Sequence, residues 1–199
     1  MLYIPGNHEP YDDSVENTYD VIHDWLAKHA KHVEFMLNPK SIEINGVTFL
    51  CTSLWTDFKD VDPSVMAKAG RRMNDYRNIM YRGRSLDPLD VLTWHREAIE
   101  FLKIELARPG PKVVMSHHAP HERGLNRGHS GRDLDYCYYT DLTDLIEEAV
   151  DLRYWVHGHT HVVTEYKIGN TTVLSNQRGY IGREELAYRF GARFFEVES

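Results

Sequence analysis

The stretch His157-Gly158-His159-Thr160-His161 places three imidazoles within five residues. An apolar run, Tyr154-Trp155-Val156, precedes it, and Val162-Val163 follows it. This pattern predicts a strand that ends in a tight turn, which the glycine permits, and a second strand that leaves it. In extended backbone His159 and His161 would share a face and reach one metal centre or two adjacent ones. Surface histidines are the alternative, which the flanking strands disfavour.

Composition sets the broad class of protein. The chain has 199 residues, of which 42% are apolar and 27% charged, so we expect a single globular domain over residues 1–199. No apolar run approaches the roughly 20 residues of a membrane span, and the first residues do not form a signal peptide. Two lone cysteines, Cys51 and Cys137, predict free thiols in a reducing cytoplasm. The net charge of -7 argues against nucleic acid as a partner.

The periodicity of apolar residues predicts an α/β protein. Strands are expected at residues 2–4, 33–37, 42–44, 48–54, 112–116, 154–156, 162–168, 171–175 and 193–197. Helices are expected at residues 14–31, from Asp87-Pro88 to about residue 108, and after Asp141. Asn45-Gly46 predicts a hairpin turn, and residues 57–86 are expected to be irregular. Helices alternate with the early strands and hairpins join the later ones, which indicates a layered sheet with an antiparallel part.

Three loops that follow predicted strands carry the chemically informative side chains. Asn7 and His8 follow the first strand, His117 and His118 follow residues 112–116, and His159 follows residues 154–156. In open α/β sheets the site lies beyond the carboxyl ends of the strands, so we expect the three loops to converge. Imidazole nitrogens and an amide oxygen are suitable ligands for Mn, Fe, Zn or Ni.

Three motifs occur in the order of a known family. Gly6-Asn7-His8-Glu9, Ser116-His117-His118-Ala119-Pro120 and Gly158-His159-Thr160-His161 resemble those of the calcineurin-like metallophosphoesterases. Residues 54–58, 73–77 and 178–180 resemble a bacterial and phage single-domain branch of that family. The resemblance implies a layered α/β metallophosphoesterase sheet flanked by helices. It also implies hydrolysis of phosphate mono- or diesters by a metal-activated hydroxide.

The resemblance also implies roles for individual residues. Asn7, His117 and His159 would ligate the second of two divalent ions, and His161 would ligate the first. His8 would contact the phosphate or protonate the leaving oxygen as a general acid. The expected partner is therefore a phosphate-ester substrate, with no membrane involved, and the sequence does not indicate an oligomeric state.

Two of the family's motifs, Asp-x-His and Gly-Asp-x-x-Asp, do not occur in this sequence. No glycine precedes an aspartate, and no aspartate has a histidine two positions later. The resemblance therefore predicts an N-terminally truncated member with strands missing, impaired activity and at most one bound ion. A non-catalytic binding or regulatory module with a degenerate metal site is one alternative. A nuclease-type member acting on nucleic acid is another, and the acidic net charge disfavours it.

Other polar residues near the motifs carry weaker signals. Arg123, Arg127 and Arg132 follow the second motif and could bind substrate phosphates, although a solvated loop explains them equally well. His118 and His157 could orient the metal ligands, or they could simply lie nearby.

Overall fold

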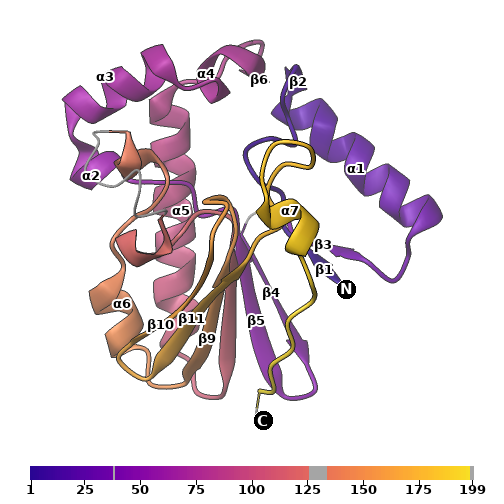
Figure 1. Cartoon of the computed structure of the whole chain (residues 1–199), viewed down its shortest axis with the longest axis vertical. Coiled ribbons are helices and arrows are strands. Elements are labelled where there is room, and N and C mark those ends of the chain that lie inside the picture. The colour runs from indigo at the N-terminus through magenta and orange to yellow at the C-terminus, as the bar shows by residue number, and fades with distance from the viewer. Residues whose placement is uncertain (38, 126–133, 198–199) are drawn as a thin grey trace.

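The computed structural model describes residues 1–37, 39–125 and 134–197 (Figure 1). Within them, a mixed six-stranded sheet has the strand order β10-β11-β9-β8-β5-β4. Its four inner strands are parallel and its two edge strands are antiparallel to their neighbours, which confirms the predicted α/β layered sheet. The strands are β4 (Lys40–Ile44), β5 (Val47–Thr52), β8 (Lys112–Ser116), β9 (Leu152–His157), β10 (Val163–Ile168) and β11 (Thr171–Asn176).

Short strands form two smaller sheets. β1 (Leu2–Tyr3) pairs in parallel with β3 (Glu34–Phe35), and the other sheet contains β2 (Asp13–Ser14), β6 (Ile79–Tyr81) and β7 (Arg84–Ser85). The hydroxyl of Ser53, just after β5, donates a hydrogen bond to the carbonyl of Pro5 at 2.7 Å. This bond ties the loop after β1 to the carboxyl edge of the main sheet.

The helices of the described residues are α1 (Val15–His29), α2 (Phe58–Val61), α3 (Pro63–Arg72), α4 (Asp75–Asn78), α5 (Pro88–Leu106), α6 (Thr143–Glu148) and α7 (Leu186–Arg189), with 3-10 turns η1 (Glu122–Gly124) and η3 (Asp135–Cys137). The three longest of them, α1, α3 and α5, begin just after residues whose side chains cap them, Ser14, Asp62 and Asp87. Asp87 caps α5 in a capping box with Asp90, as the Asp-Pro pair predicted. The residues of α2 all have positive φ, so this segment is a single left-handed turn.

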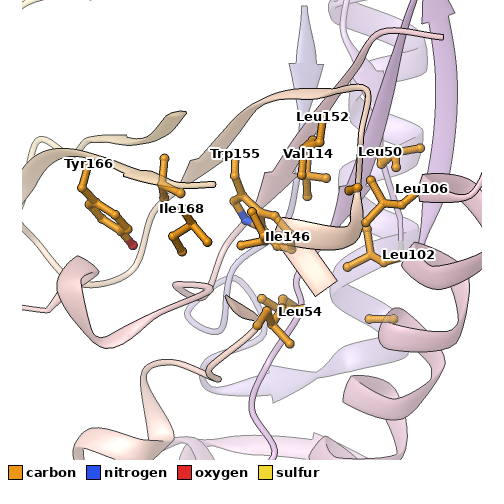
Figure 2. Close-up of a cluster of buried hydrophobic side chains, with 14 residues drawn as sticks. Leu50, Leu54, Leu102, Leu106, Val114, Ile146, Leu152, Trp155, Tyr166 and Ile168 are labelled. Carbon is orange, nitrogen blue, oxygen red and sulfur yellow. The ribbon is translucent and has the colours of Figure 1, made fainter. Parts of the chain in front are cut away.

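The main apolar core lies between the sheet and α5 and α6, which cover one of its faces (Figures 1 and 2). Trp155 is fully buried there, and its indole nitrogen donates to the hydroxyl of Ser116 at 2.8 Å. Ser116 directly precedes His117, and Trp155 lies two residues before His157. This bond therefore fixes the carboxyl ends of β8 and β9 against each other. The cluster contains Leu50, Leu54, Ala98, Leu102, Leu106, Val114, Leu142, Ile146, Ala149, Leu152, Trp155, Tyr166, Ile168 and Val173.

A second apolar cluster packs α3 and α4 against the first half of α5. It contains Val15, Trp55, Phe58, Val65, Ala69, Tyr76, Ile79, Leu86, Val91, Leu92 and Cys137. Through Tyr76, this cluster packs α4 beside Tyr11 in the loop after β1. Both cysteines are free and buried.

The structure confirms one local prediction about secondary structure and corrects another. The hairpin at Asn45-Gly46 is confirmed, since Ile44 pairs with Val47 and both turn residues have positive φ. The prediction of irregular structure over residues 57–86 is wrong, because this segment contains α2, α3, α4, β6 and β7. The longest of these elements, α3, is short and buries only Val65 and Ala69, so its sequence shows little helical periodicity.

The strand predicted at residues 193–197 is also wrong. This segment is irregular in the structure and contacts the sheet through side chains. The guanidinium of Arg193 pairs with Glu165 at 2.6 Å, and the ring of Phe195 packs on Tyr154.

No helix in the described part of the chain is long and apolar enough to cross a membrane.

Candidate functional site

The three motif-bearing loops meet at one edge of the main sheet. Ser116 pairs with Thr52 on β5 and with His157 on β9, so these parallel strands end level with one another. A cleft of about 1240 Å³ opens over this edge. Its lining includes residues from all three motifs, from α3 and α4, and from the segment after β11: Asn7, His8, Glu9, Tyr11, Arg72, Asp75, His117, Tyr138, His157, His159, His161, Arg178, Tyr180 and Glu184.

Three electron-pair donors converge at the floor of this cleft. The Nε2 of His117 lies 2.9 Å from the Oδ1 of Asn7 and 3.1 Å from the Nδ1 of His159. Two ligands that each lie about 2.1 Å from one ion are about 3.0–3.4 Å apart in octahedral or tetrahedral geometry. The spacing therefore fits a shared ion. Among the described residues, no three His, Cys, Asp or Glu side chains gather to hold a metal, so the amide oxygen is needed as the third donor.

The chemistry of the donors fits a metal as well. Burial, and then the charges of neighbouring histidines, hold the pKa of both His117 and His159 well below its usual value. Both rings therefore stay neutral and keep a free electron pair, which metal ligation requires. The Nε2 of His159 is buried and has no hydrogen-bond partner among the described residues.

Gly6 is required for the position of His117. A Cβ atom built on Gly6 would lie 2.4 Å from the Cε1 atom of the His117 ring, well inside van der Waals contact. The imidazole thus packs directly on the backbone of the Gly6-Asn7 segment. Here the glycine serves close approach rather than an unusual backbone angle.

The backbone of the His159–His161 turn differs from the prediction. Both histidines have positive φ, 70° and 53°, so the extended conformation expected for them is wrong. The side chains consequently diverge. His159 turns to His117, while the Nδ1 of His161 lies 2.9 Å and 3.1 Å from the two carboxylate oxygens of Glu184. Gln177 holds the turn by accepting from the backbone N–H of His161 and donating to the carbonyl of Gly158.

His8 lies exposed at the mouth of the cleft. Its Nδ1 is 3.3 Å from the hydroxyl oxygen of Tyr180, and its ring packs on Tyr11 with centroids 4.3 Å apart. With Nδ1 facing Tyr180, Nε2 is the nitrogen left to meet a substrate. No hydrogen bond joins His8 to the three converging donors in the described structure, although its charge contributes, after burial, to the lowered pKa of His117 and His159.

The remaining predicted residues occupy different places. His118 packs its ring on His159 with centroids 4.1 Å apart, and its Nδ1 faces the carbonyl of Ser53 at 3.2 Å. Burial lowers the pKa of His118 to about 3 and that of His157 to about 4. His157 lines the cleft with its Nε2 buried and unpartnered in the described structure.

The structure places Arg123 away from the cleft lining. Its guanidinium stacks over Tyr166 and donates to the carbonyl of Lys167 at 3.0 Å. Arg127 and Arg132 lie outside the described residues. Among the described residues, the arginines that line the cleft are Arg72 and Arg178.

Sequence reasoning did not assign a role to Asp75 or Glu184. The buried Asp75 carboxylate accepts from the Nδ2 of Asn7 at 2.7 Å and from the hydroxyl of Tyr11 at 3.2 Å. Asp75 falls within the segment 73–77 that supported the resemblance, which was the available signal. Glu184 lies in an exposed segment with no periodicity, so nothing in the sequence links it to His161.

Comparisons with known proteins identify a matching family and two similar solved structures. The family described as calcineurin-like phosphoesterase matches residues 1–163. The solved structure of a phosphopantetheinyl hydrolase from Mycobacterium tuberculosis is similar, with a TM-score of 0.61 at 15% identity over 90% of this chain and 69% of that one. A second solved structure has a TM-score of 0.49 at 11% identity, over 88% of this chain and 56% of its own. No curated protein sequence matches the chain.

Proposed function

Because this chain belongs to the calcineurin-like phosphoesterases, we propose that it hydrolyses phosphate mono- or diesters with a divalent metal ion. The observation that carries the proposal is the convergence of Asn7, His117 and His159 at the floor of the cleft. The structurally similar phosphopantetheinyl hydrolase, by its name, is a hydrolase too. At 15% identity it supports the fold and not a particular substrate.

The proposed metal ligands are the Oδ1 of Asn7, the Nε2 of His117 and the Nδ1 of His159. A divalent ion bound there would polarise the phosphoryl oxygens and lower the pKa of a water so that hydroxide is available near neutral pH. The three ligands are neutral and thus leave the positive charge of such an ion for the phosphate. Mn, Fe, Zn or Ni suit this mixed nitrogen and oxygen set.

His8 would act on the substrate from the mouth of the cleft. Tyr180 holds the Nδ1 side of the ring, so Nε2 can carry the proton to the leaving oxygen. The cleft volume of about 1240 Å³ leaves room for a sizeable leaving group. Arg72 and Arg178 on the lining supply positive charge for an anionic substrate.

The experiment is an assay with an aryl phosphate monoester and the corresponding diester in added Mn²⁺. We expect metal-dependent hydrolysis that His117→Ala abolishes and that His23→Ala, on the exposed surface of α1, leaves unchanged. Turnover that survives His117→Ala would contradict the proposal. Inactivity of the wild-type chain when Mn, Fe, Zn and Ni are each tested in turn would contradict it as well.

A binding or regulatory module is the second candidate. The observation that favours it is that, among the described residues, no three His, Cys, Asp or Glu side chains gather around His161 to hold the implied first ion. Binding of Mn²⁺ and of inorganic phosphate by calorimetry, with no hydrolysis of any ester, would favour this candidate over the enzyme.

A further inference from the structure

The side-chain amide of Asn7 can ligate a metal in only one of its two orientations. Its oxygen has electron pairs to give, whereas its NH₂ group has none available. In the structure, Oδ1 faces the Nε2 of His117 and Nδ2 faces the carboxylate of Asp75. If the amide turned over, the NH₂ group would point at the metal position and the site would lose a ligand.

Asp75 fixes the orientation of this amide. An ionised carboxylate accepts hydrogen bonds and cannot donate them. The end of Asn7 that faces it must therefore be the NH₂ group, because the reverse would set two oxygens against each other. The bond is short, 2.7 Å, and joins two side chains that are only 4% and 3% exposed. A charge-assisted hydrogen bond in such a place is stronger than one in water.

The position of Asp75 in the fold supports this role. Asp75 is the first residue of α4, yet Asn74 occupies the cap position, and the Asp75 side chain reaches Asn7, 68 residues away in the sequence. Its second oxygen accepts from the hydroxyl of Tyr11 at 3.2 Å, which fixes the carboxylate plane. Neighbouring Tyr76 anchors α4 in the second apolar cluster.

The charge of Asp75 also points to a cation nearby. None of the ion pairs among the described residues includes Asp75. A buried carboxylate without a counter-ion is costly unless a positive charge lies close to it. An ion on the far side of the Asn7 amide would supply that charge, and the carboxylate would in turn polarise the amide and strengthen its oxygen as a ligand.

We propose that Asp75 is a positioning residue that orients the Asn7 amide so that its oxygen faces the ion held with His117 and His159. This inference rests on the proposed metal site. Tyr11 contributes indirectly, because its hydroxyl orients Asp75, which in turn orients Asn7. Removing a partner of this kind commonly weakens metal binding by about 10–100-fold.

The test compares Mn²⁺ affinities by calorimetry in wild-type protein, Asp75→Ala, Asp75→Asn and Tyr11→Phe. We expect Asp75→Ala to bind about 10–100-fold more weakly. Asp75→Asn should recover part of that loss, because its amide oxygen can still accept from Asn7. Glu185→Gln is the matched control: it removes one negative charge from the cleft lining without touching Asn7, and should bind as the wild type does.

A second readout separates orientation from general damage to the fold. In metal-free protein, the side-chain NH₂ protons of Asn7 should be slow to exchange in nuclear magnetic resonance spectra, and this protection should disappear in Asp75→Ala. If Asp75→Ala fails to fold, Asp75→Ser decides, because its side chain is too short to reach Asn7, and wild-type affinity in that variant overturns the inference.

His117→Ala distinguishes failure of the inference from failure of the metal site. Loss of Mn²⁺ binding in His117→Ala together with wild-type affinity in both Asp75 variants would overturn the role of Asp75 and leave the proposed function standing. Wild-type affinity in His117→Ala would remove the metal site itself, and the role of Asp75 with it.

Discussion

The hydroxyl of Tyr180 lies 3.3 Å from the Nδ1 of His8, although 172 positions separate the two residues. The segment after β11 thus reaches across the cleft to the loop after β1. The same segment brings the carboxylate of Glu184 to His161. Two histidines of the predicted site are therefore held by residues near the end of the described chain.

His8→Ala tests the role of that histidine as the general acid. General acids contribute about 10²–10⁴-fold to rate, so we expect turnover to fall by that factor while metal content stays the same. Tyr180→Phe should lower turnover less, because it removes only the hydroxyl that holds Nδ1. The measurements are steady-state kinetics and metal analysis of each purified variant. Loss of bound metal in His8→Ala would show that His8 is a ligand.

Gly6→Ala should impair the metal site although it adds a single methyl group. The new Cβ would lie 2.4 Å from the His117 ring, so the ring must move and its Nε2 leaves the ligand position. We expect a clear loss of Mn²⁺ affinity by calorimetry. Gly191→Ala is the control, since a Cβ there meets no atom within 4 Å in the described structure. Equal affinities for the two variants would refute the close-packing argument.

Buried His95 should make stability depend on pH. Its Nδ1 lies 2.9 Å from the carbonyl of Leu54, and burial lowers its pKa below the ordinary value of 6.5. The unfolded chain therefore binds a proton below pH 6.5 that the folded chain does not, so the contribution of His95 is complete above pH 6.5 and is lost as the pH falls below it.

Urea unfolding of metal-free protein between pH 7.5 and 5 measures this effect. The free energy of unfolding should fall more steeply for wild type than for His95→Gln, by at most about 1.4 kcal/mol per pH unit for one proton. The other buried histidines are present in both proteins, so the comparison isolates His95 together with its electrostatic effect on His118. Parallel curves would contradict the assignment. A single cooperative transition would support the prediction that residues 1–199 form one domain.

The sequence predicted elements whose signals are local. Asn45-Gly46 predicted the hairpin because its turn needs two residues with positive φ, and Asp87-Pro88 predicted the start of α5 through its cap. The convergence of His117 and His159, which follow β8 and β9, was predictable because parallel strands of one sheet end at the same edge. Asn7 follows β1, which lies in a separate small sheet, and the hydrogen bond from Ser53 to Pro5 brings its loop to that edge.

Features that depend on tertiary contacts were not predictable. The left-handed backbone of His159 and His161 depends on the side chain of Gln177, which no local pattern links to the turn. The tail after residue 190 has apolar residues typical of a strand, yet its described residues form no strand and contact the sheet through Gly191, Arg193 and Phe195. Asp75 was visible as a motif residue, but its contact with Asn7 needed the packing of α4.

The measurement that tests the central claim most directly is the number of metal equivalents bound by the purified 199-residue chain. We predict at most one equivalent of Mn²⁺ or Zn²⁺, bound in the wild type, lost in His117→Ala and in His159→Ala, and retained in His161→Ala. Two equivalents in the wild type, or one equivalent that survives His117→Ala, would contradict the assignment of Asn7, His117 and His159 as the metal site.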